Sequence, residues 1–178
     1  AAAKGLEASG FLNGGGLDAV LANAGVAVGG MSGATGFTSK ELADNLQTNT
    51  FGVVNTCFAF LPLLRKGNKK QIFITSSTVG SIGGYFSETP LATAYAMSKA
   101  AVNMFAVKLS RELAPEGFTV IPFCPGYVKT DMNKRDGKQE GELEPEEACR
   151  LAVKNVFLAA KPEDTAKFMA QDGSSRPW

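Results

Sequence analysis

The stretch Gln71-Ile72-Phe73-Ile74-Thr75-Ser76-Ser77 decides the fold that this sequence predicts. Its centre is apolar without the alternation expected of a strand that has one face in water. Such an uninterrupted run is typical of a strand that is covered on both faces of a sheet. Two serines follow directly, where the strand gives way to a loop. We therefore predict an inner strand over residues 71–75.

Other apolar segments on both sides of this stretch predict further strands: residues 17–22, 118–123 and 167–170. The segment 118–123 contains Pro122, which has no N–H for a strand ladder, so this prediction is the less secure one. Residues 131–142 are charged and rich in glycine, and are expected to be a mobile loop.

Helical spacing of apolar residues predicts the elements between the strands: helices over 38–65, over 94–114, and from Pro145 onward. Thr38 and Glu41 have the spacing of a capping box, and Thr93 is expected to cap the second helix. Strands that alternate with long helices indicate an α/β fold. We expect a Rossmann-like, doubly wound parallel sheet in three α/β/α layers.

Composition limits the chemistry. The 178 residues predict one domain over 1–178, with 44% hydrophobic and 20% charged residues. A net charge of +1 favours neither nucleic acid nor an anionic membrane as a partner. No apolar run reaches the roughly 18 residues that span a bilayer.

The chain has three cysteines and no histidine. Cys57, Cys124 and Cys149 are far apart in apolar stretches, so we expect buried thiols in a reducing compartment, the cytoplasm. The absence of histidine excludes Ser-His-Asp and Cys-His catalysis, and no metal site is predicted. Acid–base chemistry must therefore use Tyr, Lys, Asp or Glu.

Tyr95 and Lys99 are four residues apart on a predicted helix and so share one of its faces. An ammonium beside a phenol lowers the phenol pKa and makes it a usable proton donor and acceptor. The alternative is a core tyrosine beside a solvated lysine.

Polar or glycine-bearing segments follow the three best predicted strands: Asn23-Ala24-Gly25, Ser76-Ser77 and Pro125-Gly126. Ligands of open α/β sheets bind beyond the carboxyl ends of the strands, so these segments predict one crevice, from which the Tyr95 helix also starts. Asn49 lies in the apolar stripe of its helix. Its side-chain amide is therefore either hydrogen-bonded to nearby groups of the protein or available for a functional role.

From about Leu17 to Trp178 the chain resembles the short-chain dehydrogenase/reductase family, in its single-domain, carbonyl-reductase-like branch. Asn23-Ala24-Gly25 looks like the segment that packs under the adenine of the cofactor, and Pro125-Gly126-Tyr127-Val128-Lys129-Thr130 is similar to the segment that holds the nicotinamide carboxamide. The catalytic residues that the resemblance implies are Asn49, Ser77, Tyr95 and Lys99. The cofactor-binding residues that it implies are Asn23, Ala24, Gly25, Tyr95, Lys99, Pro125, Gly126, Val128 and Thr130.

The resemblance implies an oxidoreductase that transfers a hydride between NADP or NAD and a small carbonyl or secondary alcohol, with NADP slightly preferred. Tyr95 would transfer the proton, and Ser77 would hold the substrate oxygen. Lys99 would depress the Tyr95 pKa and bind the ribose. Asn49 would position a water, and Thr130 would bind the carboxamide. Each of these polar residues also has a purely structural interpretation, such as capping a turn.

The sequence departs from the family pattern in two ways. Ser77 and Tyr95 are 18 residues apart, a long interval that an insertion around residues 85–89 would explain, and it leaves Ser76 or Ser77 as the catalytic serine. In addition, Gly14-Gly15-Gly16 precedes a strand, whereas the family's phosphate-binding glycines follow one. About two βα units, roughly 60 residues, have no counterpart here.

The missing unit suggests an alternative, a truncated and inactive remnant or an interaction module, and we expect these residues alone to bind NAD(P) weakly. Phe51, Val54 and Phe58 lie off the core stripe of helix 38–65. A homodimer or homotetramer that pairs through this helix and helix 94–114 is expected.

Overall fold

The computed structural model describes residues 2–84, 90–135 and 138–178, and the insertion expected around 85–89 lies outside them. The helices are α1 Ala2–Ala8, α2 Ser39–Leu46, α3 Val53–Arg65, α4 Thr93–Leu113 and α5 Pro145–Ala152. The strands are β1 Ala19–Ala22, β2 Gln71–Thr75, β3 Thr119–Cys124, β4 Lys134–Arg135, β5 Lys138–Gln139, β6 Phe168–Ala170 and β7 Ser175–Arg176.

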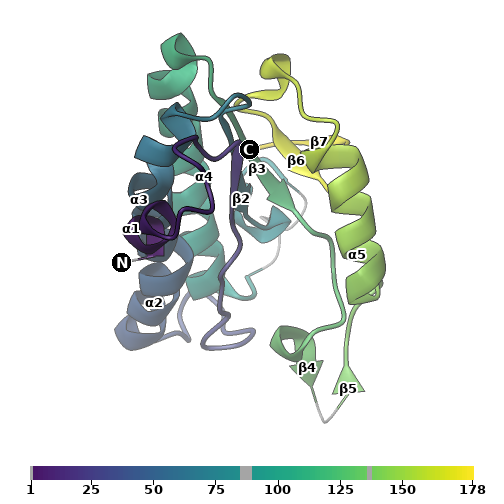
Figure 1. Cartoon of the computed structure of the whole chain (residues 1–178). Coiled ribbons are helices and arrows are strands. Elements are labelled where there is room, and N and C mark those ends of the chain that lie inside the picture. Colours follow the sequence, from purple (N-terminus) through teal and green to yellow (C-terminus); the bar gives the residue numbers. More distant parts are fainter. Residues whose placement is uncertain (1, 85–89, 136–137) are drawn as a thin grey trace.

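Five of the described strands form one sheet in the order β1-β2-β3-β6-β7. The first four are parallel, and β7 runs antiparallel to β6. β2 is an inner strand over the predicted residues, with Phe73 beside Leu21 on one side and Ile121 on the other. Figure 1 shows α1 to α4 on one side of this sheet and α5 on the other.

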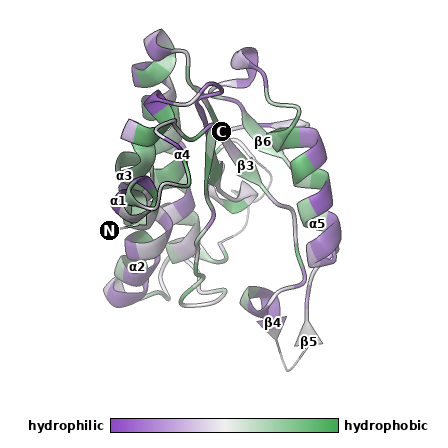
Figure 2. Cartoon of the chain, in the orientation of Figure 1, coloured by the Kyte–Doolittle hydropathy of each residue, from purple (hydrophilic) through white to green (hydrophobic). Residues whose placement is uncertain are grey.

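The uninterrupted apolar character of β2 has a direct structural cause. Ile72 and Ile74 pack into the core under α3 and α4, together with Val102 and Leu64. Phe73 points to the other face, where its ring lies 4.8 Å from that of Phe157, just beyond α5. Both faces of the strand therefore need apolar residues, and hydrophobic stretches of the helices supply the partners (Figure 2).

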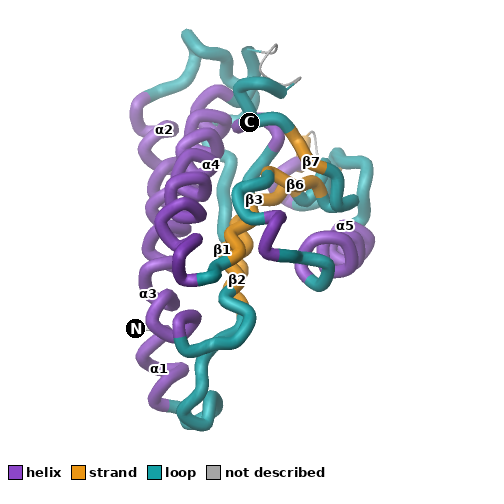
Figure 3. The backbone as a smooth tube through the Cα atoms, turned by 90° about the horizontal axis from the view of Figure 1, so that it is seen from above, coloured by secondary structure: helices purple, strands orange, loops and turns teal. Residues whose placement is uncertain are grey.

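Seen from above, the sheet forms a middle layer between two layers of helices (Figure 3). This confirms the expected three-layer α/β/α fold. Within the described residues β1 pairs only with β2, so its other edge is open and Leu21 is 43% exposed.

The helix expected over 38–65 is interrupted. Its capping box is confirmed, because Glu41 N donates to Thr38 Oγ1 at 3.2 Å and Thr38 N donates to Glu41 Oε2 at 2.6 Å. However, residues Gln47–Gly52 form a π-helix, η1, between α2 and α3. The wider turn carries the buried Asn49, and π-turns of this kind often occur at functional sites.

Several expected boundaries need correction. The first strand begins at Ala19, the third covers Thr119–Cys124 and the last begins at Phe168. Pro122 is tolerated inside β3 because pairing with β6 starts only at Phe123.

Thr93 is not the cap of α4. Ala92 occupies that position in a left-handed conformation, while the Thr93 hydroxyl donates to Pro90 O at 3.1 Å. Cys149 is exposed, unlike the buried Cys57 and Cys124, because it lies on the outer side of α5; all three thiols are free.

The segment 131–142, expected to be a mobile loop, holds a short 3₁₀ turn over Asp131–Asn133 and the β4–β5 hairpin in its described part. No helix in the described ranges is long and apolar enough to cross a membrane. The same residues contain no group of three His, Cys, Asp or Glu that could hold a metal ion.

Candidate functional site

The three segments predicted to meet follow β1, β2 and β3, at the carboxyl edge of the sheet. The Thr75 hydroxyl donates to Asn23 Oδ1 at 2.9 Å, which links the ends of β1 and β2. Ser76 N donates to Phe123 O at 2.8 Å, which continues the pairing of β2 with β3. These bonds bring Asn23 and the serine pair to a common edge.

The turn after β2 packs directly against α4. A Cβ atom on Gly80 would lie 2.6 Å from the Lys99 backbone carbon, so only glycine fits here. This close approach places the Ser77 turn beside the face of α4 that carries Tyr95 and Lys99.

Tyr95 is half-buried, and its burial raises the pKa of the phenol to about 12. A hydrogen bond with the Ser77 hydroxyl acts in the opposite direction but is the smaller effect. The expected lowering of the Tyr95 pKa by Lys99 is therefore wrong for this structure. The Lys99 ammonium lies 5.7 Å from the centre of the ring, and the dominant effect on the phenol pKa is desolvation of the phenolate.

Lys99 is only 2% exposed, so the alternative of a solvated lysine is wrong. Its ammonium donates to Thr75 O at 2.9 Å, and burial lowers its pKa to about 8. An ammonium has three N–H donors. In the described part of the chain this contact is its single hydrogen bond, which leaves two donors for a ligand.

The structure distinguishes the two candidate serines. Ser76 is buried, and its hydroxyl donates to Asn103 Oδ1 on α4. Ser77 is half-buried, and its hydroxyl is close enough to the Tyr95 phenol to lower the pKa of that group; its oxygen accepts from Val79 N at 3.4 Å. Ser77 is the serine that faces the tyrosine.

Asn49 joins the loop after β1 to α4. Its amide accepts from Val26 N at 2.8 Å, and donates to Val26 O and to Ser98 Oγ, each at 2.9 Å. Ser98 in turn donates to Tyr95 O at 2.7 Å. A Cβ on Gly25 would lie 3.3 Å from Asn49 Oδ1 and 3.6 Å from Lys99 Nζ, so these three residues are close together.

The segment Pro125–Thr130 turns sharply at Gly126, which has a φ of +89°. A side chain there would also meet Gln171 Nε2 at 2.9 Å. Val128 O accepts from Asn133 Nδ2 at 2.7 Å, and Thr130 begins the 3₁₀ turn without capping it through its side chain. Among the described residues these contacts lead to the turn after β6 and to the 3₁₀ turn before β4, and none of them involves Tyr95.

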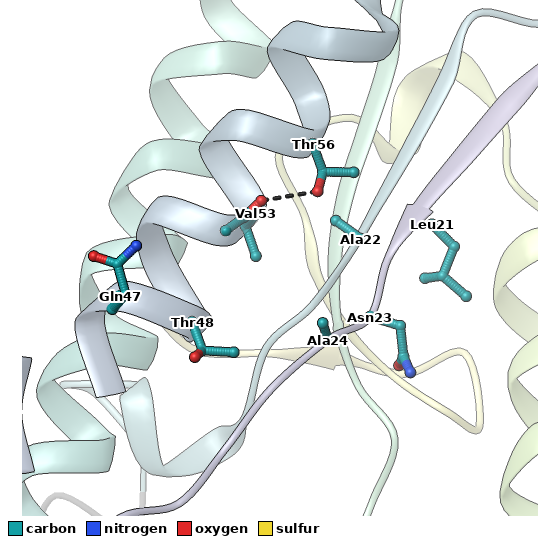
Figure 4. Close-up of a pocket in the computed structure, with 9 residues that line it drawn as sticks. Leu21, Ala22, Asn23, Ala24, Gln47, Thr48, Val53 and Thr56 are labelled. Carbon is teal, nitrogen blue, oxygen red and sulfur yellow. Dashed lines mark hydrogen bonds between the residues drawn. The ribbon is translucent and has the colours of Figure 1, made fainter. Parts of the chain in front are cut away.

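An open pocket lies between the end of β1 and the helical segment that starts at Gln47; Figure 4 shows Ala22 and Ala24 on the side of the strand that faces this segment, and Leu21 and Asn23 on the other side. Its wall on the helix side consists of Gln47, Thr48, Gly52, Val53 and Thr56. Ser77, Tyr95 and Lys99 do not line it. The pocket beside Asn23 and Ala24 therefore does not extend to the proposed proton-transfer residues, although Gly25 of the same segment lies close to Lys99.

Sequence reasoning missed Asn45, Ser98 and Asn103, which are all buried. Asn45 bonds the backbone of Val28 just as Asn49 bonds that of Val26. The spacing could have identified two of them, because Asn45 is four residues before Asn49 and Asn103 is four residues after Lys99. Residues four positions apart on a helix share one face, so these polar residues lie on the same faces as the predicted site residues.

Comparison with known proteins shows which protein family this chain is similar to. The family model described as short chain dehydrogenase matches residues 8–141. An uncharacterized oxidoreductase of Schizosaccharomyces pombe is 39% identical over 144 residues, which cover 74% of this chain and 56% of that protein. The C-signal protein of Myxococcus xanthus is 32% identical over 163 residues, which cover 91% of this chain and 93% of that protein.

Similar solved structures include carbonyl reductases. The carbonyl reductase Sniffer of D. melanogaster superposes with a TM-score of 0.88 at 28% identity, covering 99% of this chain and 72% of that one. An NADPH-bound carbonyl reductase from chicken fatty liver has a TM-score of 0.84, with the same identity and coverage. The chain spans just over half the length of the yeast relative and almost all of the C-signal protein.

Proposed function

The chain belongs to the short-chain dehydrogenase family, and we propose that it carries the catalytic residues of an NAD(P)-dependent oxidoreductase. Its substrate would be a small carbonyl compound or the corresponding secondary alcohol. We also propose that residues 1–178 form a single, partial cofactor-binding domain that contains both the acid–base residues and the nicotinamide end of the cofactor site. The free thiols are our reason for proposing a reducing compartment, the cytoplasm.

One observation carries this proposal: the Ser77 hydroxyl is close enough to the Tyr95 phenol to lower its pKa, and both lie beside a buried lysine whose ammonium has donors to spare. A buried lysine without an acidic partner costs free energy. A bound ligand that accepts hydrogen bonds from the ammonium would offset this cost. A lysine with a purely structural role would have no such compensation.

In the reducing direction a bound nicotinamide supplies the hydride. The Tyr95 phenol donates its proton to the substrate oxygen, and the Ser77 hydroxyl donates a hydrogen bond to the same atom. A phenol with a pKa of about 12 keeps its proton at neutral pH, so Tyr95 is ready to act as the acid. In the oxidising direction it must first lose that proton, which a rising pH favours.

The described residues fit part of an NAD(P) molecule. The spare N–H donors of Lys99 suit ribose hydroxyls, and Asn23, Ala24 and Gly25 border an open pocket. Gly14 to Gly16 lie before β1, and Gly16 packs against the backbone at Gly67, so they do not form a phosphate-binding turn. The NADPH-bound neighbour is the reason for preferring NADP.

Replacing Ser77 tests this function. We expect Ser77→Ala to slow NADPH-dependent reduction of 4-nitrobenzaldehyde by about 100-fold, because the substrate oxygen loses a positioned donor. Loss of NADPH absorbance measures the rate. Ser110→Ala is the matched control, since Ser110 is a buried serine of α4 whose hydroxyl donates to Val107 O, one turn away. Equal rates for the two variants would refute the role of Ser77.

A second candidate function is an interaction module, which the apolar outer face of η1, α3 and α4 favours. Phe51, Phe58, Met97 and Met104 on this face are 45–59% exposed. The Phe58 ring contacts Phe105 edge-on at 6.1 Å, so α3 and α4 present one continuous apolar surface. Such surfaces usually mark protein contacts, and we propose a second copy of this chain as the partner.

A charge on this face tests the pairing. We expect the wild-type chain to sediment as a dimer or tetramer at micromolar concentration, and Phe58→Glu as a monomer, because burying an unpaired carboxylate is costly. Leu158→Glu, which places the same charge on an exposed leucine beyond α5, is expected to leave the assembly intact. A monomeric wild type, or a dimeric Phe58→Glu, would contradict this.

A further inference from the structure

Ser76 and Asn103 form a buried polar pair behind the proposed site. They are 2% and 5% exposed. The Ser76 hydroxyl donates to Asn103 Oδ1, and Asn103 Nδ2 donates to Gly80 O at 3.3 Å. Both ends of the Asn103 amide are thus engaged with a single turn of the chain. Polar groups in an apolar interior are tolerated only with such partners.

These two hydrogen bonds are made by residues on either side of Ser77 in the chain. Ser76 immediately precedes it, and Gly80 follows it by three residues. Between them the turn is closed by Gly80 N, which donates to Ser77 O at 3.0 Å, and by Ser81 N, which donates to Thr78 O at 3.1 Å. One side chain therefore holds both flanks of the turn that carries the Ser77 hydroxyl.

Asn103 lies on α4, one helical turn after Lys99 and two after Tyr95. At Gly80 the turn also approaches the Lys99 backbone too closely for any side chain. The Ser77 turn is thus attached in two ways to α4, the helix that carries Tyr95 and Lys99. One is the pair of hydrogen bonds that Asn103 makes with Ser76 and Gly80, which we call the clamp. The other is the close backbone contact between Gly80 and Lys99.

We propose that Asn103, through Ser76 and Gly80, is a positioning residue that sets the Ser77 hydroxyl against the Tyr95 phenol. The inference rests on the proposed function for the roles of Ser77 and Tyr95. Asn103 contacts neither substrate nor cofactor and acts only through the turn. Its loss should loosen the turn and lower the rate of the chemical step, while cofactor binding by other residues is unchanged.

Hydrogen–deuterium exchange tests the clamp without any need for activity. In Asn103→Leu we expect the amides of Gly80 and Ser81 to exchange about tenfold faster, because the turn loses its buried hydrogen bonds to α4. Ser76→Ala removes one of these bonds and is the milder variant should Asn103→Leu fold poorly. Asn155→Leu is the matched control, since the Asn155 amide also donates to a backbone carbonyl, that of Gln171, at 3.2 Å.

Kinetics test the positioning role. We expect Asn103→Leu to lower kcat for 4-nitrobenzaldehyde by about tenfold with an unchanged KM for NADPH. The double variant with Ser76→Ala should be no slower than Asn103→Leu alone, since both changes break the same link.

Unchanged exchange at Gly80 and Ser81 in both variants would overturn the clamp. Faster exchange with an unchanged kcat would overturn the positioning role. A wild-type chain that transfers no hydride would refute the proposed function instead, and the exchange data would still decide whether Asn103 holds the turn.

Discussion

Tyr95→Phe is expected to reduce carbonyl reduction by at least about 100-fold, the usual effect of removing a general acid. The ring stays in place and only the phenolic hydroxyl is lost, so packing against Lys99 is preserved. Affinity for NADPH, measured by calorimetry, should change little. Steady-state rates with 4-nitrobenzaldehyde measure the loss.

Tyr127→Phe is the matched control for this variant. Tyr127 lies after β3, is 41% exposed, and its hydroxyl bonds to Glu140 at 3.0 Å. The control should lower the rate much less than Tyr95→Phe. A Tyr95→Phe variant with near-normal turnover would contradict the assignment of the general acid.

Lys99→Met is expected to have two opposite effects. The rate of reduction should fall by at least about tenfold, because the variant lacks the ammonium donors. The free energy of unfolding should nevertheless rise at pH 7. A pKa of about 8 in place of 10.5 corresponds to a penalty of about 3 kcal/mol for keeping the ammonium buried and charged. Losing the bond to Thr75 O cancels about 1–2 kcal/mol of that gain.

The pH dependence identifies the source of this gain. The folded pKa of Lys99 lies below its unfolded value, so the unfolded chain binds more protons between about pH 8 and 10.5. Wild-type stability should therefore rise relative to Lys99→Met across this window, and the advantage of the variant should shrink. The raised pKa values of Tyr95 and Cys57 act in the opposite direction at alkaline pH, but both proteins contain these groups.

Urea unfolding of both proteins at pH 7, 9 and 10 (roughly spanning the window set by the two pKa values) measures this difference. A variant that is less stable than the wild type at pH 7 would contradict the account of Lys99 as a costly buried charge. A difference that does not change with pH would contradict its titration.

Much of the fold could be predicted because local patterns dominate it. β2 was predicted over its observed residues, since each face of an inner parallel strand needs apolar side chains. The capping box of α2 depends on only two residues three positions apart in the chain. The meeting of Asn23 with the end of β2 followed from the parallel order alone.

The remaining features depend on contacts between distant segments. The π-helix forms where Asn49 must reach both Val26 and Ser98, neither of which helical spacing identifies. The choice between Ser76 and Ser77 depends on Asn103, which lies 27 residues along the chain from Ser76. The direction of the Tyr95 pKa shift depends on how deeply the phenol is buried, and the spacing to Lys99 does not reveal burial.

Transfer of a deuteride tests the central claim most directly. The 178-residue chain is incubated with 4-nitrobenzaldehyde and NADPH that is deuterated at C4 of the nicotinamide, and the product alcohol is analysed by mass spectrometry. We predict deuterium on the carbinol carbon with the wild-type chain, and at least about 100-fold less of it with Tyr95→Phe. No deuterated alcohol from the wild type, or equal amounts from both proteins, would contradict an acid–base site built on Ser77, Tyr95 and Lys99.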